Sequence, residues 1–307
     1  MSDTLVGRVV GAFGRHLLVR DAAGGELRAR PFGRALSVVC GDDVRCRLDA
    51  HHDEVHVIEV LPRRSALWRA TQRGGAEPVV ANLTHLLVVL APLPAPDWFV
   101  IDRYLAAATA GGITATLIVN KSDLGIDASL SAELQVYAAA GYSALPCSAA
   151  TGAAVAALPA TLGAGSVAAL VGQSGVGKSS LVQRLLPEAQ LAIGELVREE
   201  EGRHTTTAAR LFDLPGGAAL IDSPGVRDFA PAVEALDAGS LGFVEVARLA
   251  SGCRFNDCIH MREPGCAVRA AAASGALHPR RYESYRRLRR LREELTAARG
   301  PRRGRGR

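Results

Sequence analysis

Short segments that alternate hydrophobic and polar residues dominate the first 60 or so residues of the chain. Strands are predicted, between turns near 23–25, 41–43 and 51–53, over residues 5–10, 16–20, 26–30, 43–48 and 55–61. Several short strands at this spacing are typical of a small barrel such as an oligonucleotide-binding (OB) fold. An SH3-like barrel fits the pattern nearly as well. We expect an all-β domain over residues 1–64, with a face suited to single strands or RNA loops.

A different pattern follows residues 62–78, a polar stretch that we interpret as a linker. Hydrophobic strands are predicted at 85–91, 115–119, 144–147 and 167–171, with helices at 98–110, 130–140 and 179–186 between and after them. Residues 208–214 and 218–221 flank Pro215-Gly216-Gly217, which indicates a hairpin. Alternating strands and helices predict a mainly parallel sheet covered on both faces, as a central α/β domain over residues 65–232.

The remaining residues, 233–307, are predicted to form an α-helical domain. A helical region at 233–249 precedes a cluster of Cys and His residues, and a basic helix begins near His278. Apolar residues recur in that helix at a spacing of three to four: Tyr282, Tyr285, Leu288, Leu291 and Leu295. We interpret this stripe as core packing, with Arg286, Arg287, Arg289, Arg290 and Arg292 around it available for phosphate contacts.

Composition and charge narrow the class of protein. Hydrophobic residues make up 48% of the chain, but no apolar run approaches the length of a membrane span, so we expect a soluble cytoplasmic protein without membrane contact. Residues 279–307 contain twelve Arg and three Glu, a local +9, which leaves −4 of the net +5 for the rest. RNA is the expected polyanionic partner of this tail, and a solvated end without a specific role is the alternative.

Only two lysines occur beside thirty-four arginines, and each lies in a nucleotide-binding pattern. Gly172-x4-Gly177-Lys178-Ser179 follows an apolar strand and begins a helix, as a phosphate loop requires. Backbone N–H groups of the loop and the helix N-terminus bind phosphates, Lys178 reaches the β- and γ-phosphates, and the Ser179 hydroxyl binds Mg²⁺.

Asn120-Lys121-Ser122-Asp123 lies after the strand that ends at residue 119. The Asp123 carboxylate can accept hydrogen bonds from N1–H and the exocyclic amine of guanine, a donor pair that adenine lacks. Lys121 would lay its methylene chain on the base, and Cys147-Ser148-Ala149 resembles the segment that contacts the guanine oxygen. Because this base motif precedes the phosphate loop, the order predicts a circularly permuted GTP-binding domain.

The third nucleotide motif is Asp222-Ser223-Pro224-Gly225. Asp222 is predicted to hold the water shell of Mg²⁺, and the Gly225 N–H to meet the γ-phosphate. The polar segment 199–207 has the character of a switch that γ-phosphate and Mg²⁺ order, with Thr206 the preferred Mg²⁺ ligand; an ordinary surface loop is the alternative.

Hydrolysis is expected to be slow without a partner. Val226 stands where many GTPases carry a glutamine that orients the attacking water, which an apolar side chain cannot do. His204 is the nearest candidate for that catalytic role, the alternative being a polar loop residue that only caps or packs.

Three cysteines and a histidine lie within fourteen residues: Cys253, Cys258, His260 and Cys266. Three thiolates and one imidazole complete a tetrahedral zinc shell without an open position, so a structural rather than catalytic Zn²⁺ is predicted. Reduced cysteines buried in the core are the alternative.

With these motifs, the chain resembles the circularly permuted ribosome-small-subunit-dependent GTPases over essentially its whole length. The most specific parts are NKSD preceding GQSGVGKSS, then GRHTTT, DSPGVRDF, and CRFNDCIHMREPGCAV leading to RYESYRRL. The resemblance implies an N-terminal OB-fold barrel, a central permuted P-loop GTPase and a C-terminal zinc-binding domain. It also implies a role in late maturation of the small ribosomal subunit, low GTP hydrolysis stimulated by that subunit, and rRNA binding near the decoding region.

The resemblance also assigns site residues. Nucleotide binding maps onto Asn120, Lys121, Asp123, Ser148, Ala149, Gly172, Gln173, Ser174, Gly175, Val176, Gly177, Lys178, Ser179, Ser180, Asp222 and Gly225. The catalytic histidine maps onto His204, and the ligands of one zinc ion onto Cys253, Cys258, His260 and Cys266. We expect a monomer that binds GTP with Mg²⁺, and GDP after hydrolysis. Two other interpretations are a nucleotide kinase and an RNA-binding scaffold with a vestigial nucleotide site.

Overall fold

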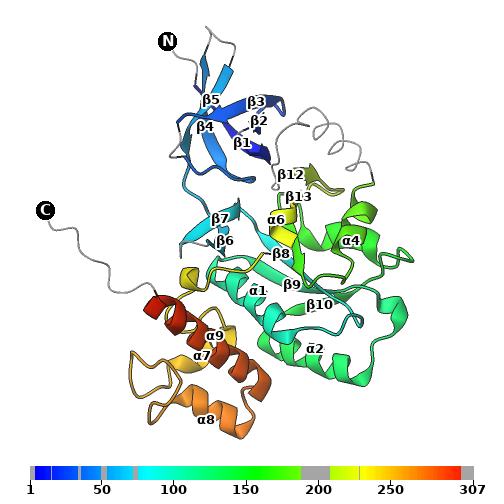
Figure 1. The fold of residues 1–307 in the computed structure, drawn as a ribbon. Helices are drawn as coiled ribbons and strands as arrows, with labels where there is room; N and C mark the ends of the chain where they lie inside the picture. Colours follow the sequence, from blue (N-terminus) through cyan, green and yellow to red (C-terminus); the bar gives the residue numbers. More distant parts are fainter. Residues whose placement is uncertain are drawn as a thin grey trace, which may run out of the picture.

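The computed structural model describes residues 4–14, 16–33, 36–49, 54–71, 75–187, 208–227 and 229–298. The chain passes from a barrel through a central α/β sheet to a helical C-terminal module (Figure 1). No helix in these ranges combines the length and the apolar character that crossing a membrane requires.

The first five strands form a closed barrel. They are β1 (Thr4–Phe13), β2 (His16–Asp21), β3 (Glu26–Pro31), β4 (Asp43–Asp49) and β5 (Glu54–Val60). Their order is β1-β2-β3-β5-β4, and antiparallel pairing of β4 with β1 completes the circuit. Val9, Val19 and Val57 lie at the centre of its core and are fully buried. The predicted five-stranded OB-type barrel is therefore confirmed.

The interpretation of residues 62–78 as a linker was wrong. The antiparallel hairpin β6 (Ala66–Ala70) and β7 (Ala76–Ala81) begins within that stretch, and a bulge falls between Leu67 and Trp68. Leu67 and Val80 are buried in the main hydrophobic core, which stabilises the hairpin although its strands are short and do not alternate strictly between polar and apolar residues. Burial against another element, rather than local alternation, decides this structure.

The central sheet has the predicted parallel architecture. Five parallel strands and the antiparallel β12 follow the order β10-β9-β8-β11-β13-β12. The strands are β8 (His85–Leu90), β9 (Thr114–Val119), β10 (Ser143–Pro146), β11 (Val167–Gly172), β12 (Ala208–Asp213) and β13 (Ala219–Asp222). Successive residues of β8 point to opposite faces, so Leu86 and Val88 enter one hydrophobic core and Leu87 and Val89 the other.

Helices cover both faces of this sheet. Residues of α1 (Trp98–Ala110), α2 (Ala128–Ala140) and the single turn α6 (Pro224–Arg227) join the first core. Residues of α3 (Leu158–Leu162) and α4 (Lys178–Leu185) join the second. Two short 3₁₀ turns, η1 (Ser122–Leu124) and η2 (Val155–Ala157), belong to this domain, and a third, η3 (Val233–Ala235), lies where the chain leaves it for the C-terminal module.

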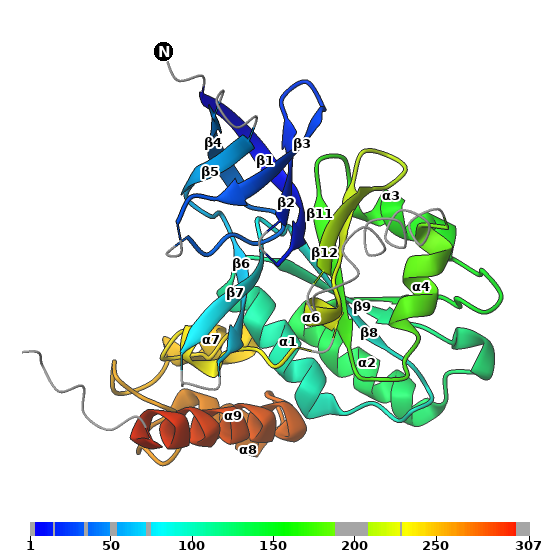
Figure 2. The ribbon, with the colours of Figure 1, turned by 45° about the horizontal axis from the view of Figure 1, so that its top comes forward.

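The barrel and the central sheet are hydrogen-bonded to each other. Strand β12 pairs antiparallel with β1, with Gly11 opposite Arg210 and Phe13 opposite Ala208. The barrel and the central domain therefore belong to one continuous sheet of eleven strands. Strand β1 is common to both parts, because it pairs with β2 and β4 of the barrel and with β12 of the central domain (Figure 2). Sequence periodicity predicted the strands but not this pairing, because pairing partners far apart in the chain leave no local pattern.

The C-terminal module differs in part from the prediction. In place of one helix over 233–249, η3 is followed by turns and then α7 (Val244–Ala250). Gly242 breaks the helix: its backbone has φ +78°, and a Cβ there would lie 2.2 Å from the carbonyl oxygen of Ala106 on α1. Helix α8 (Ala267–Ser274) was not predicted, whereas the basic helix is α9 (Pro279–Ala298).

The predicted apolar stripe of α9 is core. Tyr285 and Leu288 are buried, and Tyr282, Leu291 and Leu295 pack against the same cluster. The accompanying prediction was wrong for Arg289, which is buried and donates to the carbonyl oxygens of Ala238 and Gly239. Arg292 likewise donates to backbone carbonyls, so this side of α9 is committed to packing rather than to phosphates.

Candidate nucleotide and metal sites

The phosphate-loop sequence occupies the turn between the buried strand β11 and helix α4. At two of its glycines no other residue fits: a Cβ on Gly172 would lie 2.2 Å from the Val89 carbonyl oxygen, and one on Gly177 2.3 Å from Asn120 Nδ2. Lys178 begins α4, and its ammonium donates to the carbonyl oxygens of Gly172 (2.7 Å) and Gln173 (2.8 Å). The loop thus curls around a buried cation, with helical N–H groups at its end.

The rest of the predicted loop follows the same turn. Ser174 and Gly175 form its exposed part, Val176 is buried in the second hydrophobic core, and Ser179 and Ser180 continue α4. The Gln173 side chain accepts from the N–H of Asp97, the residue that caps α1. This links the loop to the helix on the opposite face of the sheet.

Asn120 joins the base motif to the phosphate loop. Its side-chain N–H donates to the Val176 carbonyl oxygen (2.8 Å), and its side-chain oxygen accepts from the Ala149 N–H (2.9 Å). The residue is 1% exposed, so these bonds are shielded from water. One amide therefore connects three segments that are separate in the sequence: the base motif, the phosphate loop and the turn at residues 147–149.

Asp123 and Ser148, both predicted to lie at the base, are adjacent. The Ser148 hydroxyl donates to an Asp123 carboxylate oxygen, while Ser148 is fully buried and Asp123 is exposed. Lys121 has a left-handed backbone (φ 57°), and its ammonium donates to the carbonyl oxygens of Leu93 (2.9 Å) and Gly175 (2.8 Å). The lysine chain therefore extends from the base motif toward the phosphate loop.

Asp222 ends β13, next to the strand that feeds the phosphate loop. Its two carboxylate oxygens accept from Arg227 at 2.8 and 2.6 Å, and a third bond of the same guanidinium goes to Ser179 Oγ at 2.8 Å. Asp222 and Ser179, two residues predicted to hold magnesium, thus accept hydrogen bonds from the same Arg227 side chain. Gly225 lies in α6, and Val226 is buried in the core. His204 and Thr206 lie outside the described residues.

Sequence analysis did not identify two arginines of this site. Arg227 is one, and Arg184 on α4 is the other, which donates to the carbonyl oxygens of Ala149 and Ala150 (both 2.9 Å). Their only sequence signal is position, five residues after Asp222 and six after Lys178, among thirty-four arginines. The tertiary contacts distinguish them from the rest.

The predicted metal-binding residues meet in the C-terminal module. Ligand atoms of Cys253, Cys258, His260 and Cys266 all lie within 4.8 Å of one another and could hold a metal ion. The Cys253 and Cys266 sulfurs are 3.8 Å apart, and each lies 3.5 Å from His260 Nδ1. Burial lowers the pKa of His260, which favours the neutral ring that binds metals.

The loop between these ligands is organised by one carboxylate. The N–H groups of Ile259, Met261 and Arg262 donate to Glu263 at 3.2, 2.9 and 3.0 Å. Burial by itself would raise the pKa of Glu263, but these backbone hydrogen bonds lower it to about 2, so the group is charged at neutral pH. Tyr282 on α9 donates to the His260 carbonyl oxygen (2.7 Å), which attaches the loop to the helix.

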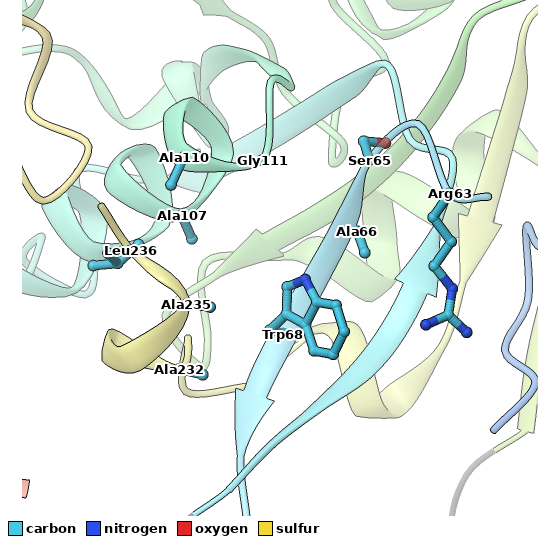
Figure 3. A pocket seen from close by; sticks show the side chains of 10 residues that line it. All are labelled: Arg63, Ser65, Ala66, Trp68, Ala107, Ala110, Gly111, Ala232, Ala235 and Leu236. Atoms are coloured by element: carbon cyan, nitrogen blue, oxygen red, sulfur yellow. The ribbon is translucent and has the colours of Figure 1, made fainter. Parts of the chain in front are cut away.

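A cavity of about 230 Å³ lies away from both sites, between β6, α1 and η3. Figure 3 shows the Trp68 indole beside small residues of the other two elements. Ala232, Ala235 and Leu236, which line it, belong to the segment that leads from α6 to the C-terminal module. The Ala232 N–H donates to the Trp68 carbonyl oxygen, so this connection is attached to the hairpin.

The strand that carries the base motif precedes the phosphate-loop strand in the chain, yet both belong to one parallel sheet. This arrangement defines the class of circularly permuted P-loop GTPase folds. Two solved structures agree: YloQ, described as a circularly permuted GTPase (TM-score 0.69, 21% identity, 98% of this chain and 97% of that one), and YjeQ from Thermotoga maritima (TM-score 0.70, 24% identity, 98% and 100%).

The family follows from the sequence comparisons. The RsgA GTPase family model matches residues 60–231. Proteins named small ribosomal subunit biogenesis GTPase RsgA from Pseudomonas aeruginosa and Azotobacter vinelandii are 43% identical, over 92% of this chain and 84% of theirs. The chain belongs to the RsgA GTPase family.

Proposed function

We propose that this chain hydrolyses GTP to GDP and phosphate, and acts as a nucleotide-controlled factor in late maturation of the small ribosomal subunit. The observation that carries the proposal is the Asn120 side chain, which joins the base motif to the phosphate loop. This buried connection holds the base motif and the phosphate loop in a fixed arrangement, as binding of one nucleotide by both would require. Family membership and the names of the 43% identical relatives support the ribosomal role.

The nucleotide would be bound by four segments of the chain. Asp123 would accept from guanine, with Lys121, Ser148 and Ala149 beside the base. Residues 172–180 would surround the phosphates with backbone N–H groups, and the Gly225 N–H would meet the γ-phosphate. The exposed position of Asp123 beside the buried Ser148 supports this role, since the carboxylate is oriented and still accessible.

Mg²⁺ fits the donor set at the end of β13. A serine hydroxyl and a carboxylate are oxygen ligands that Mg²⁺ prefers, and Ser179 and Asp222 lie close enough to share one guanidinium. Thr206 is the third proposed ligand. When bound, the ion would neutralise charge that develops on the phosphates during hydrolysis.

The buried Val226 cannot orient an attacking water, so intrinsic turnover is proposed to be slow. His204 is proposed to supply that positioning when the protein is bound to the small subunit.

The metal ion of the C-terminal module is proposed to be one structural Zn²⁺. Tetrahedral zinc bonds place two sulfurs about 3.8 Å apart and a sulfur and a nitrogen about 3.6 Å apart. The distances between the Cys253, His260 and Cys266 donor atoms, 3.5 to 3.8 Å, match these values. Four protein ligands leave no open position for chemistry.

The remaining proposals concern organisation and partners. We propose three domains, residues 1–64, 65–232 and 233–307, in a cytoplasmic monomer that binds rRNA through the barrel and the arginine-rich end. The exposed Phe32, with the Arg47 guanidinium 5.0 Å from its ring centroid, supports an RNA-facing barrel surface.

GTP turnover with and without purified small ribosomal subunits tests this function. We expect little phosphate release from the protein alone, a large stimulation by the subunit, and no stimulation in His204→Ala. ATP in place of GTP, and large subunits in place of small ones, are the controls. If the small subunit does not change GTP turnover, and if the protein binds RNA equally well with GTP and with GDP, an RNA-binding scaffold would be favoured instead.

A further inference from the structure

The side chain of Arg227 bridges the two groups proposed to bind Mg²⁺. Two of its three hydrogen bonds reach both oxygens of the Asp222 carboxylate, which is 7% exposed, and the third reaches Ser179 Oγ. A bidentate guanidinium–carboxylate pair is among the stronger hydrogen-bonded contacts in proteins, and burial of the acceptor reduces its screening by water. The contact is therefore a defined interaction rather than a loose surface pair.

Local geometry explains why Arg227 reaches this position. Asp222 ends β13, the turn α6 begins two residues later, and the N–H groups of Val226 and Arg227 donate to the Ser223 carbonyl oxygen. One helical turn returns the chain above the end of the strand, so the residue five positions on faces the carboxylate. The Val226 side chain anchors this turn in the core, whereas the Arg227 side chain is partly exposed at 23% and can leave by rotation alone.

We propose that Arg227 is a built-in competitor of Mg²⁺ that lowers the apparent magnesium affinity of the nucleotide complex and so accelerates GDP release. Arg227 donates to Ser179 Oγ and to both oxygens of the Asp222 carboxylate, the groups that would hold Mg²⁺, and the two cations could not use the same lone pairs at once. When bound, Mg²⁺ would be held by Ser179 and Asp222 and would add to the attraction between the protein and the phosphates, so easier loss of the metal would mean faster loss of the nucleotide.

The size of the effect follows from linkage. The Mg²⁺ concentration for half-saturation is multiplied by one plus the equilibrium constant for closing the Arg227 contact, because only protein with this contact open binds the metal. For a bidentate but partly exposed ion pair, a factor of about ten is expected. Arg227→Gln removes both the positive charge and the paired N–H donors of the guanidinium, whereas Arg227→Lys keeps the charge but loses the bidentate geometry.

The test is the rate of mant-GDP dissociation from the full-length protein, measured across a titration of free Mg²⁺. Arg227→Gln should lower the half-saturating Mg²⁺ concentration about tenfold, with Arg227→Lys in between. Arg45→Gln is the matched control, because Arg45 also pairs with a carboxylate, that of Glu59 on the barrel, far from the nucleotide. Its Mg²⁺ dependence should equal that of the wild type.

The inference rests on the proposed magnesium site, and the experiment separates the two. If wild-type protein binds mant-GDP with a clear Mg²⁺ dependence and both Arg227 variants share the wild-type midpoint, the inference is overturned and the proposed function survives. A higher Mg²⁺ requirement in Arg227→Gln overturns it as well, because Arg227 would then assist metal binding. If wild-type protein binds no mant-GDP, the proposed nucleotide site itself fails.

Discussion

At the scale of single residues, the site depends on a few polar side chains whose partners lie far away in the sequence. Asn120 is the clearest case, because its two hydrogen bonds connect residues 56 and 29 positions away. Burial makes each bond costly to lose, since an unpaired polar group away from water costs about 1–3 kcal/mol. The motif residue is thus a structural connector, apart from any contact with a nucleotide.

Asp123→Asn tests the proposed recognition of guanine by the Asp123 carboxylate. The amide presents an N–H group where guanine N1–H and the exocyclic amine need an acceptor, so GDP affinity should fall about 100-fold or more. Xanthine nucleotides, with an oxygen in place of the amine, should regain affinity for the variant. Titration with mant-GDP and mant-XDP measures both changes, and Ser122→Ala is the control. Equal GDP affinity in Asp123→Asn and wild type would remove Asp123 from the base site.

At the scale of elements, the Cys/His cluster lies where two of the C-terminal helices meet their connecting loop. Helix α8 begins directly after Cys266, and the loop ahead of it is attached to α9 through the Tyr282 hydroxyl. Few backbone hydrogen bonds of regular structure lie between Cys253 and Cys266, so a bound metal would supply much of the order of this loop.

Removal of metal by a chelator should therefore loosen α7 to α9 without reaching the nucleotide site. We expect faster proteolysis within residues 244–298 and unchanged mant-GDP binding, with the released zinc measured by a colorimetric indicator. Cys253→Ala should behave like the chelated protein, and Cys40→Ala, a buried cysteine of the barrel side, should still release zinc on chelation. Unchanged protease resistance after full metal loss would contradict a structural role.

At the scale of the whole molecule, a buried ion cluster fastens the C-terminal module to the central domain. Asp102 of α1 is fully buried and accepts from Arg281 (2.6 Å), Arg280 (3.0 Å) and the Tyr137 hydroxyl (2.6 Å). Burial alone would lower the pKa of Arg281, but Asp102 and Glu245 outweigh it and raise the pKa, so the guanidinium stays charged. The two modules are therefore joined by an ion pair, Asp102 with Arg281, that is shielded from water, and by the partly exposed Arg280 beside it.

Asp102→Ala should leave Arg281 buried with less than its full compensation, and the free energy of unfolding should fall by about 3–5 kcal/mol. Thermal unfolding followed by circular dichroism measures the loss of stability. Proteolytic cleavage in the segment that precedes α9 measures the detachment of the C-terminal module. Glu283→Ala is the control, because its exposed pairs with Arg286 and Arg290 are worth less than about 1 kcal/mol. If both variants unfold at the same temperature, the cluster does not fasten the modules.

Most strands and helices of this protein, and the chemical groups of its candidate sites, follow from local patterns in the sequence. Hydrophobic periodicity was enough for the barrel strands and the parallel sheet, and glycine and lysine spacing was enough for the phosphate loop, because these depend on neighbours in the chain. The tertiary structure alone decided the β6–β7 hairpin, the pairing of β12 with β1, the broken helix at Gly242 and the burial of Arg289. It also decided which of thirty-four arginines reaches Asp222. Such contacts join residues tens of positions apart, and their energy depends on burial and distance, which no local pattern records.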